Sequence, residues 1–466
     1  MHHLTHLMET LCDGLWTYVL IVVLVACGLW FTVRTCGVQF RLLGHALRLL
    51  GESAGRQSGA KHISSFQAFA VSVATRVGTG NLAGVAIAIA TGGPGAVFWM
   101  WLTALLGAAT AFVESTLAQL FKRRGRDSFV GGPAYYILHG LHAPRMAALF
   151  AVLITLTFGL SYNSVQANTI CQALEESFGW QPWIVGLVLA AAALVIVFGG
   201  IQRISRVSSI LVPLMAVGYL LLALVVVALH WRMVPGLLQL ILRSAWGLEP
   251  IAGGGLGMVV MTGIRRGLFS NEAGEGSAPN VAATAATSHP VKQGLIQALG
   301  VFTDTLLVCS CTAFIILIGG GYAQGDTDGI RLTQTALSHV IGPAGGIFVA
   351  IAIFLFAFSS LIGNYYYGET NIRFLTSRRW VMTAYRLCSA GICVVAGAVM
   401  SLRLVWSLGD LCMALITAVN LAAILPLSRH VWRLLKHYQQ QRREGRDPTF
   451  KAADLPDLAP RLEAWE

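Results

Sequence analysis

The stretch Thr75-Arg-Val-Gly-Thr-Gly-Asn-Leu-Ala-Gly84 lies in the middle of a long apolar segment and decides the fold. Its glycines and polar residues interrupt a helix, and lipid offers no partners for the backbone groups that an interruption frees. A second stretch, Gly263-Ile-Arg-Arg-Gly-Leu-Phe-Ser-Asn-Glu-Ala-Gly-Glu-Gly-Ser-Ala-Pro-Asn280, interrupts another apolar segment in the same way. The two clusters predict two broken helices whose freed groups bind something polar.

A simpler interpretation is that these stretches are loops, or that small residues let two helices pack closely. Close packing is the better interpretation for Gly84 and Gly107. It does not account for the arginine, asparagine and glutamate side chains in the two clusters. Such groups are expensive inside a membrane and mark a functional site.

The composition predicts that the surface faces lipid. The chain has 466 residues, of which 56% are hydrophobic and only 11% charged, whereas soluble domains carry about 25% charged residues. Helices of about 20 residues cross the bilayer, and five long runs lack any charge: Leu15–Val33, Met146–Leu174, Gly179–Ile201, Val207–Leu229 and Pro343–Gly368. Strand-like alternation is absent, so we expect an all-α polytopic membrane protein.

Eleven transmembrane helices are predicted, at about 15–33, 64–91, 95–121, 146–171, 182–199, 208–230, 251–283, 293–320, 342–371, 381–400 and 406–427. Of the 32 Lys and Arg residues, 24 lie in alternate connections and in the C-terminal tail. The positive-inside rule therefore predicts an inner-membrane protein with its N-terminus outside and its C-terminus in the cytoplasm. The net charge of +11 is explained by this orientation and by anionic lipid, without nucleic acid.

The two broken helices each begin a set of five. Because five is odd, the sets have opposite orientations, which is the arrangement of an inverted repeat. We therefore divide the chain into an extra N-terminal helix with a basic loop (1–63), a first repeat (64–230), a second repeat (251–427) and a polar cytoplasmic tail (428–466). Residues in the tail lack a periodic apolar face after about residue 438, which predicts an extended or disordered segment.

Four motifs resemble those of the alanine/glycine:cation (sodium:alanine) symporter family. They are Arg76-Val-Gly-Thr-Gly-Asn-Leu-Ala-Gly84, Gly92-Gly-Pro-Gly-Ala-Val-Phe-Trp-Met-Trp101, Gly267-Leu-Phe-Ser-Asn-Glu-Ala-Gly274 and Phe356-Ala-Phe-Ser-Ser360. The resemblance covers about residues 15 to 430. It implies a fold similar to the bacterial leucine transporter, a 5+5 inverted repeat with one extra N-terminal helix.

The resemblance also implies a role for each matching position. The substrate would contact Thr79, Gly80, Asn81, Gln166, Phe269, Ser270, Asn271 and Asn364, with the amides of Thr79 and Gly80 holding its carboxylate. Sodium would be bound by the carbonyls of Ala74 and Val77 and the hydroxyls of Ser359 and Ser360. Oxygen ligands suit a hard cation. The two serines could instead bond to carbonyls of their own helix, and Gln166 could simply bridge two helices.

Five charged residues at membrane depth have no assigned role: Arg76, Glu114, Glu272, Asp304 and Glu369. A cation beside a sodium site must point away or be neutralised, so we expect Arg76 to form a structural ion pair with one of the carboxylates. Glu275 stands where the resemblance implies methionine, and it could pair with an arginine or reach water.

These observations predict a transporter, not an enzyme, that imports a small neutral amino acid (alanine or glycine) with sodium. Alanine carriers of the resembling family have tryptophan where this chain has Asn364, so a larger polar substrate such as glutamine is the alternative. The expected partners are the amino acid, sodium as coupling ion and the lipid bilayer, with no cofactor; the oligomeric state stays open. A proton-coupled carrier using Glu272 or Glu114, an ion channel and a membrane-embedded enzyme are the remaining rivals.

Overall fold

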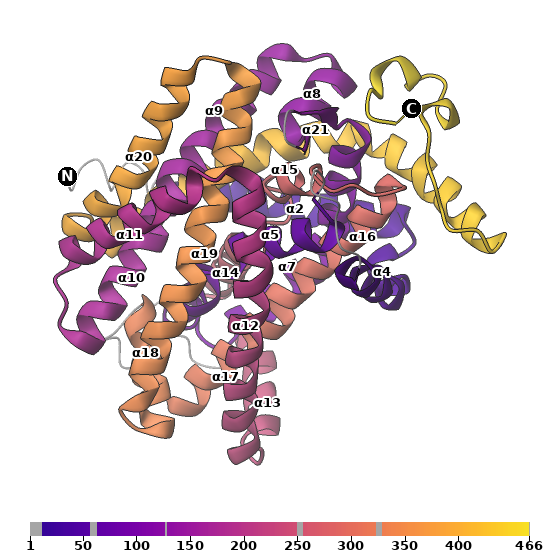
Figure 1. Cartoon of the computed structure of the whole chain (residues 1–466). Coiled ribbons are helices and arrows are strands. Elements are labelled where there is room, and N and C mark those ends of the chain that lie inside the picture. Colours follow the sequence, from indigo (N-terminus) through magenta and orange to yellow (C-terminus); the bar gives the residue numbers. More distant parts are fainter. Residues whose placement is uncertain (1–11, 56–62, 126–127, 249–254, 323–328, 466) are drawn as a thin grey trace.

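The computed structural model describes residues 12–55, 63–125, 128–248, 255–322 and 329–465, which form a helical molecule (Figure 1). The first half contains η1 Trp16–Leu20, α2 Ile21–Arg34, α3 Val38–Arg41, α4 Leu43–Gly55, α5 Ser65–Arg76, η2 Gly80–Gly84, α6 Val85–Gly92, α7 Ala96–Leu120, α8 Pro133–Leu141, α9 Pro144–Leu156, η3 Thr157–Tyr162, α10 Asn163–Phe178, α11 Pro182–Val197, α12 Gly200–Leu229 and α13 Val234–Ala245. A short antiparallel hairpin, β1 Arg123–Arg124 and β2 Phe129–Val130, follows α7.

The second half contains α14 Leu256–Asn271, α15 Ala278–Ala282, α16 Pro290–Val301, η4 Phe302–Cys309, α17 Ser310–Gly319, α18 Gly329–Ile341, α19 Ala344–Leu375, α20 Arg379–Ala398, α21 Leu402–Arg443, and the turns η5 Ala452–Asp454 and η6 Ala459–Arg461. Within the described residues, eight continuous helices are long and apolar enough to cross a membrane. The pair α5 and η2–α6, bent by 46°, makes a ninth span if it is counted as one. The chain is therefore a multi-pass membrane protein.

Exposed apolar side chains show where lipid covers the surface. On α12 they recur every three or four residues, which is one face of a helix, and all are more than half exposed: Ile210, Leu214, Val217, Leu221 and Leu224. The opposite face of α12 is buried in the protein, through Val212, Met215, Tyr219, Ala223 and Val226. A soluble protein would not leave such a continuous apolar stripe in water.

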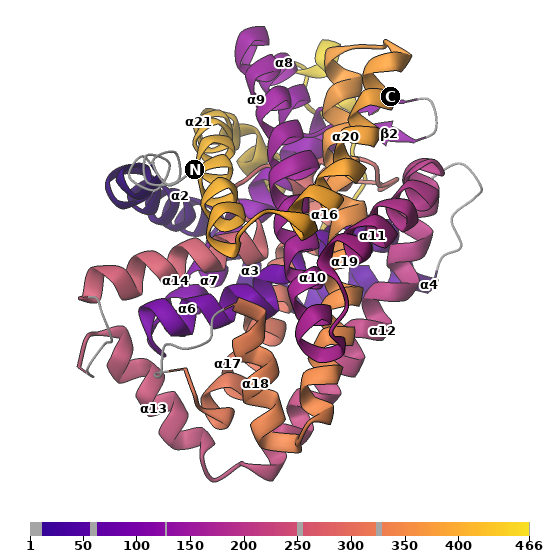
Figure 2. The same cartoon turned by 90° about the vertical axis from the view of Figure 1, so that its left-hand side faces the viewer.

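Helix α7 lies against both halves of the chain. It packs along α14 and α16, and α19 packs against α5 and α10; Figure 2 shows α19 beside α10. Glycines allow the close approach of α7 and α14: a Cβ on Gly263 would lie 2.5 Å from the carbonyl oxygen of Ala96, and one on Gly267 would lie 3.1 Å from the Cα of Met100. This packing brings the two interrupted helices together in the interior.

The first predicted interruption is confirmed, and the second is confirmed only in its later part, because residues 263–271 belong to the continuous helix α14. Helix α5 ends at Arg76, and the chain regains helical structure only at Gly80, as the π-helical turn η2. Helix α14 ends at Asn271, where Glu272 adopts a left-handed conformation (φ 55°), and α15 begins at Ala278. Residues around both breaks are buried, so neither break is an exposed loop.

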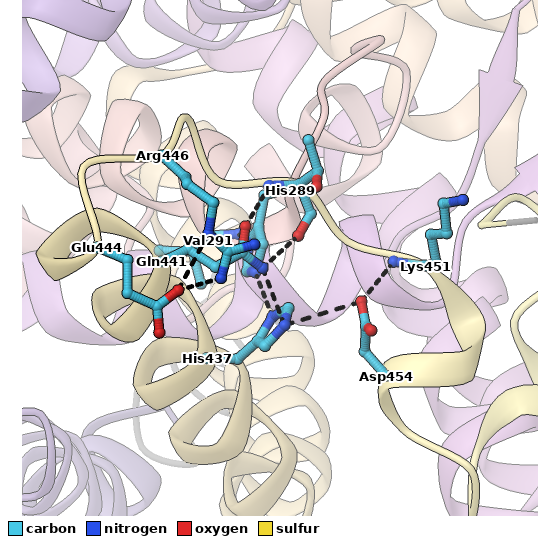
Figure 3. A network of polar contacts seen from close by, with 9 residues as sticks. His289, Val291, His437, Gln441, Glu444, Arg446, Lys451 and Asp454 are labelled. Atoms are coloured by element: carbon cyan, nitrogen blue, oxygen red, sulfur yellow. Dashed lines mark hydrogen bonds and ion pairs between the residues drawn. The ribbon is translucent and has the colours of Figure 1, made fainter.

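The C-terminal tail differs from the extended or disordered segment that we expected. Helix α21 continues to Arg443, and the following residues pack back on the molecule: the amide of Phe450 donates to the carbonyl oxygen of Ser288 (2.9 Å). Side chains tie this fold together, as Figure 3 shows, with His437 between His289 (3.3 Å) and Asp454 (3.8 Å). Burial lowers the pKa of His289 well below its ordinary value. The tail folds back because it contacts apolar and polar groups on other elements. These partners cannot be identified from the sequence of the tail alone.

Candidate functional site

The first break exposes carbonyl oxygens to hydroxyls from a distant helix. The carbonyl oxygen of Ala74 accepts hydrogen bonds from Ser359 Oγ (3.3 Å) and Ser360 Oγ (2.9 Å). Ser360 Oγ also lies 3.5 Å from the carbonyl oxygen of Val77. The structure thus brings together the four residues that were predicted to bind sodium. Both serines also bond to Phe356 in their own helix (2.8 and 3.1 Å), as the simpler interpretation expected.

Four oxygens with no nitrogen or sulfur among them form a suitable ligand set for a hard cation. All four residues are buried, each with 1% or less of its surface exposed. Carbonyl and hydroxyl oxygens carry no net charge. These ligands therefore compensate the charge of a monovalent cation only in part. The cation is then bound weakly enough to be released again.

Gln166 closes the other side of the same break. Its Oε1 accepts hydrogen bonds from the amide of Thr79 (3.1 Å) and from the Thr79 hydroxyl. Gly78 lies between α19, which bears Ser360, and α10, which bears Gln166. A Cβ on Gly78 would lie 2.3 Å from Ser360 Oγ and 3.1 Å from Gln166 Oε1. The side-chain oxygen of Gln166 is therefore bonded to the Thr79 amide, and this contact joins α10 to the first break.

Gly80, Phe269 and Ser270 form the contact between the two broken helices. A Cβ on Gly80 would lie 3.0 Å from the Cα of Ser270 and 3.2 Å from the ring of Phe269. The Phe269 ring packs between Tyr162 (4.7 Å between centroids) and Trp406 (4.6 Å). These residues, predicted to line the substrate site, do lie beside the first break.

Asn81 and Asp304 fix the shape of the first break. Asn81 Oδ1 accepts from the amide of Gly78 (2.8 Å), and Asn81 Nδ2 donates to Asp304 Oδ1 (2.6 Å). Asp304 Oδ2 accepts from the hydroxyls of Ser270 (2.7 Å) and Thr305 (2.8 Å). Three donors stabilise this buried carboxylate without a cation, and they link the two broken helices through η4.

Arg76 does not form the expected ion pair. Among the described residues no carboxylate lies within 4 Å of it, and its Nη1 donates to the carbonyl oxygen of Gln297 (3.2 Å) on α16. Glu369, one of the expected partners, pairs with Arg373 (2.5 Å) instead. The sequence gives the depth of Arg76 in the membrane, but only the packing of α5 on α16 gives the direction in which its side chain points.

The second break satisfies its own backbone. Asn271 Oδ1 accepts from the amide of Ala273 (3.0 Å), so this residue caps the turn and makes no described contact with the first break. Glu114 Oε1 accepts from the amide of Gly274 (3.3 Å), and Asn420 Nδ2 donates to the carbonyl oxygen of Gly274 (2.9 Å). Glu272 accepts from Ser277 (2.6 Å) within the same turn. Glu272 also accepts from the Thr75 hydroxyl (3.5 Å) at the end of α5, so it contacts both broken helices, whereas Glu114 on α7 binds the second break.

Asn364 lies one helical turn after Ser360 on α19. Its Nδ2 donates to Asn163 Oδ1 (3.1 Å) on α10, while its own Oδ1 is buried and has no hydrogen-bond partner. Sequence reasoning missed Asn163, Asn420 and Asp410. All three are polar residues inside long apolar helices, which is the same signal that identified the two clusters.

Comparisons with known proteins identify the family of the chain. Residues 1–452 match the Sodium:alanine symporter family. The amino-acid carrier protein AlsT of Bacillus subtilis is 50% identical, over 97% of this chain and 96% of its own. The probable sodium/glutamine symporter GlnT of Bacillus subtilis is also 50% identical (96% and 93% covered), and the sodium/alanine symporter AgcS of Methanococcus maripaludis is 36% identical (94% and 98%).

Solved structures show the same fold at low sequence identity. MhsT in complex with L-phenylalanine superposes with a TM-score of 0.51 at 14% identity, covering 86% of this chain and 93% of that chain. A manganese transporter of Eremococcus coleocola gives a TM-score of 0.52, also at 14% identity, with 86% and 84% covered. With a family match over nearly its whole length, the chain belongs to the sodium:alanine symporter family and is a sodium-coupled amino-acid symporter, not an enzyme.

Proposed function

We propose that the chain imports a small neutral amino acid, such as alanine or glycine, with sodium across the bacterial inner membrane by alternating access. The meeting of four oxygens at the first break, from Ala74, Val77, Ser359 and Ser360, carries this proposal. Sodium bound there orders the segment that bears the Thr79 amide. The substrate carboxylate then takes the place of Gln166 Oε1 on that amide and on the neighbouring amide of Gly80.

The transport cycle requires a membrane topology in which both breaks lie at the same depth. We infer eleven spans, because α11 and α14 each have 16 residues, about 24 Å of helix, and join nine other spans when the bent pair α5 and η2–α6 is counted as one. Residues 64–230 and 251–427 form the inverted repeat, residues 1–63 add one helix, and residues 428–466 lie in the cytoplasm. The N-terminus is outside, as the distribution of Lys and Arg indicates.

Uptake into proteoliposomes tests this proposal. Labelled alanine and glycine are offered with an inward sodium gradient, with equal sodium on both sides, and with a pH gradient in place of sodium. Accumulation is expected only with the sodium gradient, and it increases with an inside-negative potential, since 100 mV is worth about 2.3 kcal/mol per charge. Uptake that ignores sodium and follows the pH gradient would establish the proton-coupled rival.

Glutamine is a second candidate substrate, because Asn364 offers an unpaired acceptor. Asn163 holds the Asn364 amide group (3.1 Å), so the free atom is the oxygen. A carboxamide N–H donor on the substrate would satisfy it. Replacing Asn364 with leucine, of similar size, is expected to lower glutamine uptake at least about tenfold relative to alanine uptake. An unchanged ratio of the two rates would exclude this role.

A further inference from the structure

A cleft with one charged side lies at the end of the molecule where α14 and α21 begin. It has a volume of about 380 Å³ and is open to the outside of the protein. Figure 2 shows α6 and α14, which form part of its wall, lying side by side. Its polar lining includes Arg265, Arg266, Trp406 and Asp410. In the proposed topology this end of the molecule faces the exterior of the cell.

An ion-pair cluster forms one side of the cleft. Asp410 Oδ2 accepts from Arg266 Nη2 and lies 3.5 Å from Arg265 Nη1. Arg265 also pairs with Asp13 (2.8 Å). The guanidinium of Arg266 lies over the ring of Trp406, 4.6 Å from its centroid. These contacts hold the side chains rigidly, so the atoms that they leave free have fixed directions.

Each of the buried members of this cluster retains an atom without a partner. The unsatisfied atoms are Arg265 Nε, Arg266 Nη1, Trp406 Nε1 and Asp410 Oδ1. Arg266, Trp406 and Asp410 are at least 95% buried, with 4%, 5% and 4% of their surfaces exposed. Buried polar atoms are nearly always hydrogen-bonded. Four unsatisfied atoms on the wall of one cleft therefore indicate a ligand.

The chemistry of these atoms selects the ligand. Three are N–H donors, two of them on cations, and they match a carboxylate. The fourth is a carboxylate oxygen, which matches an ammonium group. We propose that the cleft is a second binding site for the zwitterionic α-carboxylate and α-ammonium groups of an amino acid, occupied before the central site.

The position of Trp406 links the two sites. Its ring forms part of the cleft and packs against Phe269 (4.6 Å between centroids), which also lies beside Gly80 in the central site. An amino acid in the cleft therefore lies directly behind the aromatic pair that closes the central site. This inference rests on the proposed function, because it takes the same substrate to occupy both positions.

Equilibrium binding of labelled alanine to the purified full-length protein in nanodiscs, at saturating sodium, counts the sites. The wild-type protein is expected to bind two alanines per chain. Replacing Trp406 with phenylalanine removes one donor and keeps a ring, and Arg266→Lys keeps the charge beside Asp410 but removes the free Nη1. Each variant is expected to bind one alanine per chain and to raise the KM for uptake about tenfold, with kcat little changed.

Two controls separate this proposal from simpler explanations. Trp246→Phe changes an exposed tryptophan outside the cleft lining and is expected to leave both the stoichiometry and the KM unchanged. Gly78→Ala, whose new Cβ would overfill the first break beside Ser360 Oγ, is expected to stop uptake while one alanine still binds. Saturation of the wild-type protein at one alanine per chain, or unchanged binding in both cleft variants, would overturn the second site. If the wild-type protein binds no alanine with sodium, the proposed function fails as well.

Discussion

The two helix breaks both lie in the interior, but their backbone groups have different hydrogen-bond partners. At the first break the carbonyl oxygens of Ala74 and Val77 face only serine hydroxyls. At the second break Glu114 and Asn420 hold the backbone of Gly274 from both sides. Hydroxyls can turn away and let an ion in, whereas a carboxylate and an amide that are both fully bonded cannot. The first break is therefore suited to bind and release a ligand, and the second to hold a fixed shape.

The largest expected effect comes from adding one carbon atom at the first break. In Gly78→Ala the new Cβ would lie 2.3 Å from Ser360 Oγ and 3.1 Å from Gln166 Oε1, and a well-packed interior cannot absorb such an overlap. Sodium-driven alanine uptake is expected to fall to background. Gly84→Ala is the matched control, since its Cβ would meet Trp406 at an ordinary 3.5 Å. Uptake above half of the wild-type rate in Gly78→Ala would contradict the tight packing around Gly78.

The two serines are expected to differ. Ser360 Oγ contacts both Ala74 and Val77, whereas Ser359 Oγ contacts Ala74 alone and at a longer distance. Ser360→Ala is therefore expected to raise the sodium concentration for half-maximal uptake about tenfold, and Ser359→Ala by a smaller factor. Sodium titrations of uptake at fixed alanine measure both values. Equal values for the two variants would show that the number and length of these hydrogen bonds do not predict how much each serine contributes to sodium binding.

A substitution at the second break is expected to lower the stability of the protein and to leave its sodium affinity unchanged. Asn420→Ala removes the donor to Gly274 and to Glu114 Oε2 (2.9 Å) and leaves a buried carboxylate short of a partner. The loss is about 2 kcal/mol, seen as a lower unfolding temperature of the detergent-solubilised protein. The sodium dependence of the remaining uptake should match wild type. A large shift in that dependence would mean that the second break also takes part in ion binding.

The smallest expected effect lies at Lys122, just after the end of α7. Lys122 Nζ donates to the carbonyl oxygen of Ala285 (3.0 Å), and burial lowers its pKa from 10.5 to about 7. Between pH 7 and pH 10.5 the unfolded chain holds a proton that the folded protein lacks, so folding stability rises with pH across this window. Lys122→Met should flatten this part of the pH profile of the unfolding temperature. Parallel profiles for the two proteins would exclude a neutral buried lysine.

Much of the central site could be predicted, because both breaks carry their signal locally. Glycine and polar residues inside an apolar segment are visible without any structure, and Ala74, Val77, Ser359 and Ser360 do meet. The prediction failed where a side chain had a choice of neighbours. Arg76 points to Gln297, and Asn271 caps its own turn.

The sequence by itself determined the class of molecule, a multi-pass helical transporter with two interrupted helices, because hydropathy and backbone hydrogen bonding are set by short stretches. Only the tertiary structure decided where Arg76 points, how the C-terminal tail folds back, and that Arg266, Trp406 and Asp410 line one cleft. Arg266 is separated from Trp406 and Asp410 by more than a hundred positions along the chain. Their contacts depend on how α14 and α21 pack against each other. The sequence periodicity of each helix does not predict this packing.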